Sequence, residues 1–164
     1  DSFYGAAGDD ILTGFRGSDV LYGESGDDTI RAGNGRDLIS GGDGSDIIYS
    51  GFGRNIFLSE IDGDADSLFL KSDQWAYNWI YKKLGNSPNG EKADIIEGLD
   101  SNDSIYVQGV ASSDLSFTST THTFADGQSV DGIGIFAQGV LEAIYTGGDL
   151  NAQQLQSMAS GVAA

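Results

Sequence analysis

The sequence predicts an all-β protein in which a parallel β-roll is continued by a C-terminal β-rich domain with a short terminal helix. Three observations lead to this fold class. A nine-residue repeat fills the first third of the chain, short runs of β-branched and aromatic residues follow it, and a helix N-cap signal stands near the end. We expect residues 1–70 to form the roll and residues 71–164 to form the second domain, which caps it.

Composition narrows the classes of function. The chain of 164 residues has a formal net charge of −17, and such a surface repels nucleic acid and anionic membranes. We therefore expect no nucleic-acid partner, and no membrane span either, because no apolar run approaches the length that one needs. Hydrophobic residues make up 39%, too much for simple disorder. The absence of cysteine excludes disulfides and thiolate metal sites.

Six consecutive nine-residue units run from Gly5 to Leu58 without a gap. Position 4 of every unit is glycine, position 6 is an aspartate except in the last unit, and position 8 is a large apolar residue. The position-6 residues are Asp10, Asp19, Asp28, Asp37, Asp46 and Asn55, and the position-4 glycines are Gly8, Gly17, Gly26, Gly35, Gly44 and Gly53. A disordered linker has no reason to keep this phase, so the repeat indicates an ordered, repetitive fold.

The pattern within a unit predicts its geometry. Three residues, such as "ILT" at 11–13, form a short strand, and the six residues before them turn the chain by half a circuit. Glycines in the turn permit positive φ angles. Two units complete one circuit, so that alternate units stack with strands about 4.8 Å apart. The position-8 side chains then fill a narrow core, while the position-6 carboxylates form two rows.

Stacked carboxylates at this spacing repel one another unless a cation lies between them. Calcium takes six to eight oxygen ligands at about 2.3–2.6 Å, including backbone carbonyls, which suits a glycine-rich turn that carries one carboxylate. Zinc prefers nitrogen or sulfur, and the chain has one histidine and no cysteine. Magnesium demands a stricter octahedron with several waters. The sequence therefore predicts several Ca²⁺ ions and no organic cofactor.

This nonapeptide pattern resembles the calcium-binding repeat of the RTX (repeats-in-toxin) family, whose fold is a parallel β-roll. The resemblance implies that each ion lies between two stacked turns, held by position-6 side chains and loop carbonyls. It implies bridges from Asp10 to Asp28, from Asp28 to Asp46 and from Asp19 to Asp37, and a weaker one from Asp37 to Asn55. The predicted metal ligands are Asp10, Asp19, Asp28, Asp37, Asp46, Asn55 and Asp66, the neighbouring acids Asp9 and Asp27, and the glycines Gly8, Gly17, Gly26, Gly35 and Gly44.

The acidic segment "SEIDGDADSLFL" follows the sixth unit. A shift of the frame by two residues places Asp64 at position 4 and Asp66 at position 6, which predicts a degenerate seventh turn of the roll. An EF-hand loop that begins at Asp62 is an alternative, although it lacks the glycine and the glutamate that such a loop requires. An ordinary acidic loop is the third interpretation.

The next segment, "QWAYNWIY", alternates aromatic and other residues. Trp75, Tyr77, Trp79 and Tyr81 would share one face of a strand. Such a stripe favours a cap over the exposed end of the roll. A platform for sugar rings and a helix that pairs Trp75 with Trp79 stay open as alternatives.

The second half of the chain reads as short strands and one helix. "ADIIEGLDSNDSIYVQGV" indicates strand, turn and strand, further strands are expected at 114–120, 132–139 and 140–147, and Asn151 is the candidate N-cap of a terminal helix. The segment after the repeats resembles the C-terminal domains of cyanobacterial-type RTX proteins. The positions that match are Asp94, Ile96, Leu99, Asp103, Ile105 and Val107.

The family resemblance implies a function. It implies a non-catalytic, calcium-binding C-terminal module of a secreted protein, which the type I secretion apparatus exports unfolded and which extracellular calcium then folds. We accordingly expect an extracellular or cell-surface location. The small-residue end "SMASGVAA" and the lack of an N-terminal signal peptide fit an uncleaved C-terminal secretion signal.

Two alternatives come from other classes of protein. Apolar residues at position 7, such as Ile11 and Ile47, should point outward and could support self-association in a cell-surface assembly or adhesion module of the S-layer or filament type. A surface polysaccharide is the alternative partner of such a module. The chain could also be the C-terminal module of an enzyme whose catalytic domain lies upstream. Within these residues no catalytic group is expected, because GxSxG and HExxH motifs are absent and His122 fits an exposed strand position.

Overall fold

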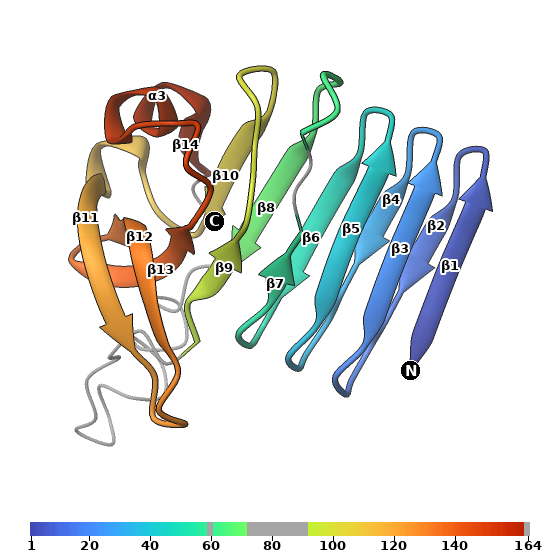
Figure 1. Cartoon of the computed structure of the whole chain (residues 1–164), viewed down its shortest axis with the longest axis horizontal. Helices are drawn as coiled ribbons and strands as arrows, with labels where there is room; N and C mark the ends of the chain where they lie inside the picture. The colour runs from blue at the N-terminus through green and yellow to red at the C-terminus, as the bar shows by residue number, and fades with distance from the viewer. Residues whose placement is uncertain (59–60, 72–91, 163–164) are drawn as a thin grey trace.

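The computed structural model describes residues 1–58, 61–71 and 92–162, which form two stacked β-sheets joined by turns along both edges (Figure 1). The first sheet has eight strands, in the spatial order β1 (Ser2–Ala7), β3 (Val20–Ser25), β5 (Leu38–Asp43), β7 (Ile56–Phe57), β9 (Asp94–Ile96), β13 (Val140–Tyr145), β12 (Ser129–Ala137) and β11 (Leu115–Thr123). The second has six strands, in the order β14 (Ala159–Val162), β10 (Ser104–Gln108), β8 (Ser67–Lys71), β6 (Ile47–Gly51), β4 (Thr29–Arg31) and β2 (Ile11–Thr13).

The register of the strands confirms a parallel β-roll with two units in each circuit. In the first sheet Val20 of β3 pairs with Ser2 of β1 on one side and with Leu38 of β5 on the other. In the second sheet Thr29 of β4 pairs with Ile11 and Ile47. Every one of these pairings is parallel and joins residues two units apart in the chain, as the repeat predicts.

The core of the roll is the column of position-8 side chains. Leu21, Ile30, Ile39, Ile48 and Phe57 are all fully buried, whereas Leu12, near the N-terminal end of the roll, is half-buried. Burial of such a side chain stabilises the fold by about 1.5–3 kcal/mol. Each circuit contributes only two of these side chains, one from each sheet, so each turn is stabilised mainly by the turns directly beside it.

Position 2 of the turns keeps one backbone conformation whether or not glycine stands there. Ala6, Phe15 and Glu24 have φ angles of 80°, 68° and 79°, in the left-handed region that disfavours residues with a side chain. The glycines at position 2 of the later units also have positive φ. The stacking of each turn on its neighbours therefore outweighs the local preference of these three residues.

The acidic segment after the sixth unit is a seventh turn of the roll. It leads into β8, which pairs in parallel with β6 and β10. An EF-hand loop would lie between two helices, whereas this loop leads into a strand of the sheet. The frame shift that placed Asp66 at position 6 therefore describes the turn correctly.

Both sheets continue past residue 70. Strand β9 pairs with β7 in the first sheet, and β10 and β14 extend the second. The division of the chain into domains at residue 70 stays a prediction about independent folding units. The aromatic stripe Trp75, Tyr77, Trp79 and Tyr81 lies outside the described residues.

A different arrangement closes the C-terminal end of the roll. β13 joins β9 in parallel, and β12 and β11 then follow as antiparallel strands. The helix α3 (Ala152–Met158) begins at Asn151, which caps it together with Gln154. These elements lie at the end opposite to β1 and β2 (Figure 1). The expected strands and helix are confirmed, whereas β14 has no counterpart among the expected elements.

Candidate calcium-binding turns

The turns along one edge of the roll are joined by a ladder of hydrogen bonds between position-6 residues. The backbone N–H of Asp10 donates to Asp28 Oδ1 at 2.7 Å, that of Asp28 to Asp46 Oδ1 at 2.7 Å, and that of Asp46 to Asp66 Oδ1 at 2.8 Å. The N–H of Asp66 continues the ladder to Asp103 Oδ1 at 3.0 Å. We call these five residues the first row.

A second ladder follows the other edge. The N–H of Asp19 donates to Asp37 Oδ1 at 2.8 Å, that of Asp37 to Asn55 Oδ1 at 3.1 Å, and that of Asn55 to Asp94 Oδ1 at 2.8 Å. We call these four residues the second row. The amino group of Asp1 also donates to Asp19 Oδ1, at 2.8 Å. One side-chain oxygen thus fastens neighbouring turns together, and an aspartate at this position carries a second oxygen besides.

In five of the turns that second oxygen lacks a hydrogen-bond partner among the residues that the structure describes. Within the described residues, the Oδ2 atoms of five buried aspartates make no hydrogen bond; they belong to Asp19, Asp28, Asp37, Asp46 and Asp66. A buried polar group left without a partner costs about 1–3 kcal/mol, and more when it is charged. Each turn therefore needs a positively charged partner for one carboxylate oxygen.

Position 1 of the turns provides a second oxygen at the same place. A Cβ atom built on Gly23 would lie 2.1 Å from Asp28 Oδ2 and 2.4 Å from the carbonyl oxygen of Gly41 in the next circuit. On Gly14 it would lie 2.8 Å from Asp19 Oδ2 and 2.5 Å from the Ala32 carbonyl oxygen. A carboxylate and a carbonyl oxygen therefore converge where glycine leaves room, and an all-oxygen donor set of this kind suits calcium.

The ligands of an ion in these turns would be mainly backbone carbonyls. Within the described ranges no three acidic or histidine side chains meet at one point. An ion would thus be held by position-6 carboxylates and position-1 carbonyls, and it would supply the charge that compensates the stacked carboxylates. The residues of these turns therefore fit a calcium ion.

Burial and mutual repulsion raise the pKa of these carboxyl groups. Loss of solvent raises the pKa of Asp46 to about 6, with the charge of Asp28 acting in the same direction. It raises the pKa of Asp66 to about 7 and that of Asp103 to about 6, where Asp103 and Asp100 respectively add to the effect. These turns consequently attract either protons or a metal cation.

From the third unit onward, the position-4 glycines are required by the close approach of stacked turns. Gly26 has a φ of 127°, and a Cβ atom there would lie 2.5 Å from the carbonyl oxygen of Gly8. The position-5 acids lie further out: Asp9 and Asp27 are exposed, and their Oδ1 atoms accept from the N–H groups of Asp27 (3.0 Å) and Ser45 (2.9 Å). Their roles as metal ligands stay predictions.

The family comparison agrees with this geometry. The model of the RTX calcium-binding nonapeptide repeat (4 copies) matches residues 1–30, 22–57 and 89–109. This is an RTX repeat protein. RTX nonapeptide repeats bind Ca²⁺, and the stacked turns described above lie largely within the residues that match this repeat. No curated protein matches the chain.

The RTX match at residues 89–109 covers two ladder residues that sequence reasoning did not assign to the roll. Asp94 and Asp103 each precede an isoleucine by two residues, as Asp46 precedes Ile48, and they stand nine residues apart. That spacing is the signal that could have found them. The segment between Lys71 and Asp94 breaks the phase of the repeat and hides it.

The histidine of this RTX chain lies in a different environment from the one expected. His122 is half-buried on β11, and its ring meets the Phe124 ring edge-on, with centroids 4.6 Å apart. The sequence predicted an exposed position on a strand. The strand is confirmed, but packing against Phe124 partly covers the ring.

Proposed function

We propose that this calcium-binding RTX module is a calcium-dependent folding unit of a secreted protein and has no catalytic role of its own. The observation that carries the proposal is the set of five buried carboxylate oxygens that lack a hydrogen-bond partner among the described residues. A chain with this feature is stable only when something outside the sequence neutralises them.

The free energies involved support calcium binding as a switch between the unfolded and folded states rather than as a modest stabilisation of a chain that is already folded. The net charge of −17 opposes compaction, and the core is narrow. Calcium that binds only the folded state stabilises it by about 2.7 kcal/mol for each independent site at a hundredfold excess over the dissociation constant. Several such contributions are comparable with the whole stability of an ordinary domain, about 5–15 kcal/mol.

The same switch suits export. At low calcium the carboxylates repel one another and the chain stays unfolded, which is the form that a type I secretion apparatus would carry; calcium outside the cell then folds it. Within the described ranges, none of the helices has the length and apolar character that crossing a membrane requires. We propose an extracellular or cell-surface location for the folded form.

The test is a calcium titration followed by far-UV circular dichroism. We expect a largely unordered spectrum in EGTA, a cooperative gain of β-structure on adding calcium, and little effect of magnesium. Asp28→Asn should raise the calcium concentration at the midpoint. Asp43→Asn removes the same charge from an exposed position of the same edge and serves as the matched control. A spectrum that is identical with and without calcium would overturn the proposal.

Self-association is a second candidate, favoured by one observation. Ile11 and Ile47, at position 7 of the second sheet, are 74% and 40% exposed. Two apolar side chains on one sheet face support a contact between molecules in an assembly or adhesion role. Light scattering of the calcium-loaded protein tests this: an Ile11→Ser, Ile47→Ser variant should have a lower mass than the parent if this face associates, and equal monomer masses would refute it.

Binding of a surface polysaccharide finds less support in the described residues. Tyr49, Phe69 and Tyr106 stack face to face across β6, β8 and β10, with 4.7 Å between neighbouring ring centroids. A sugar ring needs an open aromatic face, and in this ladder the faces mainly cover one another. The ladder stabilises the sheet as cross-strand pairs do.

A further inference from the structure

The sixth unit differs from the others in the way its position-6 side chain is satisfied. Asn55 is fully buried, and its Oδ1 accepts from the N–H of Asp37 at 3.1 Å. A backbone N–H can only donate, so the atom that faces Asp37 must be the amide oxygen. The amide nitrogen is thereby directed at the carbonyl oxygen of Ser50, to which it donates at 3.2 Å.

This hydrogen bond takes the place of a metal contact. In the turns of Asp28 and Asp46 the second side-chain atom is an oxygen that makes no hydrogen bond within the described residues. In the turn of Asn55 the corresponding atom is an NH₂ group, which repels a cation and already satisfies the carbonyl of Ser50. The donor set of this turn does not fit calcium.

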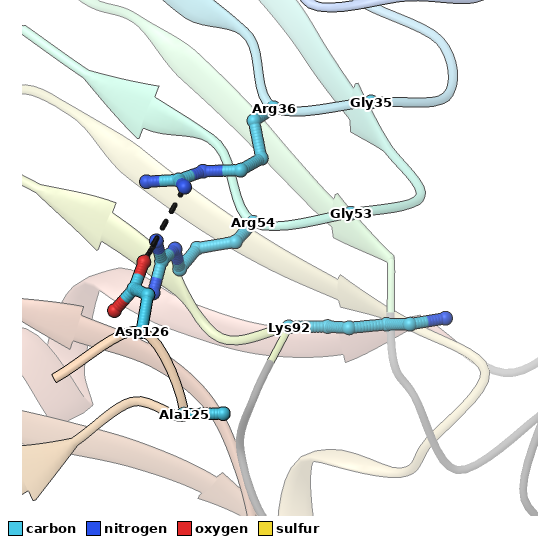
Figure 2. Close-up of a pocket in the computed structure, with 7 residues that line it drawn as sticks. All are labelled: Gly35, Arg36, Gly53, Arg54, Lys92, Ala125 and Asp126. Atoms are coloured by element: carbon cyan, nitrogen blue, oxygen red, sulfur yellow. Dashed lines mark hydrogen bonds and ion pairs between the residues drawn. The ribbon is translucent and has the colours of Figure 1, made fainter. Parts of the chain in front are cut away.

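A positive charge from the chain itself stands beside this turn. Arg54 is 6% exposed, its guanidinium pairs with the Asp126 carboxylate, and it lies 4.1 Å over the ring of Phe124. Arg36, one circuit earlier at the same position, reaches the same carboxylate at 3.4 Å. Figure 2 shows both arginines pointing toward Asp126 at a pocket of about 350 Å³, while Lys92 points away from it.

The partners of Arg54 come from a distant part of the chain. Phe124 and Asp126 lie between β11 and β12, and Asp126 follows Arg54 by 72 residues. The N–H of Gln128 donates to Asp126 Oδ1 at 3.0 Å, which orients the carboxylate. The arginine thus joins the last regular turn of the second row to the tip of the β11–β12 hairpin.

We propose that the turn from Ser50 to Asn55 is closed without calcium by the Asn55 amide, and that the Arg54–Asp126 pair beside it fastens the β11–β12 hairpin to the roll. The sequence-based expectation made Asn55 a weak calcium ligand; the geometry assigns it the role of a substitute for the ion. The proposal rests on calcium binding by the other turns and goes beyond the folding role proposed for them.

The decisive measurement is the number of calcium ions bound, counted by native mass spectrometry of the full chain. Asn55→Asp should bind one ion more than the parent, because two oxygens would then face each other across the turn. Asn34→Asp adds the same charge at an exposed position of a second-row turn and should leave the count unchanged. Equal counts for the parent and Asn55→Asp would overturn the proposal.

A second variant guards against misfolding. Ser50→Gly combined with Asn55→Asp restores the glycine and the aspartate of a regular unit, and we expect it to fold in saturating calcium with the same extra ion. If neither variant folds in saturating calcium, the proposal is also contradicted, because it predicts a site equivalent to that of Asp46. Failure of the calcium-dependent folding role itself would show separately, as a parent protein whose fold does not respond to calcium.

The hairpin contact has its own readout. In the calcium-loaded protein, Asp126→Asn should increase hydrogen exchange several-fold at residues 124–128, with little change in the first-row turns. Asp131→Asn alters an exposed carboxylate elsewhere on the hairpin and is the control. Unchanged exchange at the tip in Asp126→Asn would refute the fastening role.

Discussion

The first and second rows lie along opposite edges of the roll and are built on the same kind of hydrogen-bond ladder, but their charges are balanced differently. The first row is carboxylate throughout, from Asp10 to Asp103, and exposed acids such as Asp9 and Asp27 flank it. The second row contains the neutral Asn55, and Arg36 and Arg54 stand beside it. The comparison shows that the hydrogen-bonded ladder tolerates either side chain, whereas the need for a cation follows from the second oxygen alone.

The largest expected effect is the loss of a first-row carboxylate. Asp46→Asn keeps an oxygen for the ladder but removes the charge, so it should cost up to about 2.7 kcal/mol of calcium-dependent stability at a hundredfold excess over the dissociation constant. A calcium titration followed by circular dichroism would show the midpoint moving to higher concentration. Asp43→Asn, an exposed change in the same turn, is the control; equal midpoints would remove the distinction between the two positions.

Acidity should replace calcium mainly along the first row. Burial raises the pKa values of Asp46, Asp66 and Asp103 to about 6, 7 and 6, above the ordinary value of 3.8. The folded state then binds more protons than the unfolded state between about pH 4 and pH 7, so stability without calcium falls as the pH rises through this window. We expect a higher melting temperature at pH 5 than at pH 8 in calcium-free buffer.

A variant of Asp66 tests whether the pH dependence of stability comes from the first-row carboxyl groups. Asp66→Asn removes the group with the highest of these pKa values and should flatten the dependence of the melting temperature on pH. Asp64→Asn, two residues away and exposed, should leave it unchanged. A calcium-free protein that becomes less stable between pH 8 and pH 5 would show that repulsion in the first row does not control folding.

A smaller effect is expected at the arginines of the second row. Arg54→Met should lower the melting temperature of the calcium-loaded protein by a few degrees, because the buried side chain loses both its ion pair and its contact with Phe124. Arg36→Met should have less effect, since that side chain is 55% exposed. Differential scanning calorimetry can rank the two; an equal or reversed order would contradict the assignment of the fastening contact to Arg54.

The smallest effect should be a gain in stability at position 2. Glu24 has a φ of 79°, so Glu24→Gly relieves backbone strain at some cost in chain entropy, and we expect a net gain of about 0.5–1 kcal/mol. Glu24→Gln removes the charge beside the first row without relieving the strain. Chemical denaturation in saturating calcium should separate them, and a stability of Glu24→Gly equal to that of Glu24→Gln would argue against strain.

Part of the site could be predicted from the sequence because the repeat is local. The phase of glycine, aspartate and apolar residues indicated which side chains point into the core and which form rows, and Leu21, Ile30 and Ile48 lie where it placed them. The seventh turn at Asp66 also followed from a small shift of frame. Asp94 and Asp103 were not assigned to the rows, because the segment before Asp94 interrupts the period and a broken phase carries no information about which turn stacks on which.

The sequence by itself determined the roll and the two rows of position-6 side chains in its six regular units, since both depend on residues within nine or eighteen positions of one another. Only the tertiary structure decided how the amide of Asn55 is oriented, because that depends on the N–H of Asp37 in the preceding circuit. It also decided that Arg54 meets Asp126, a contact across 72 residues that no local pattern encodes. A repetitive fold can be predicted from its local sequence pattern, whereas the place where the repeat ends is decided by contacts between distant segments.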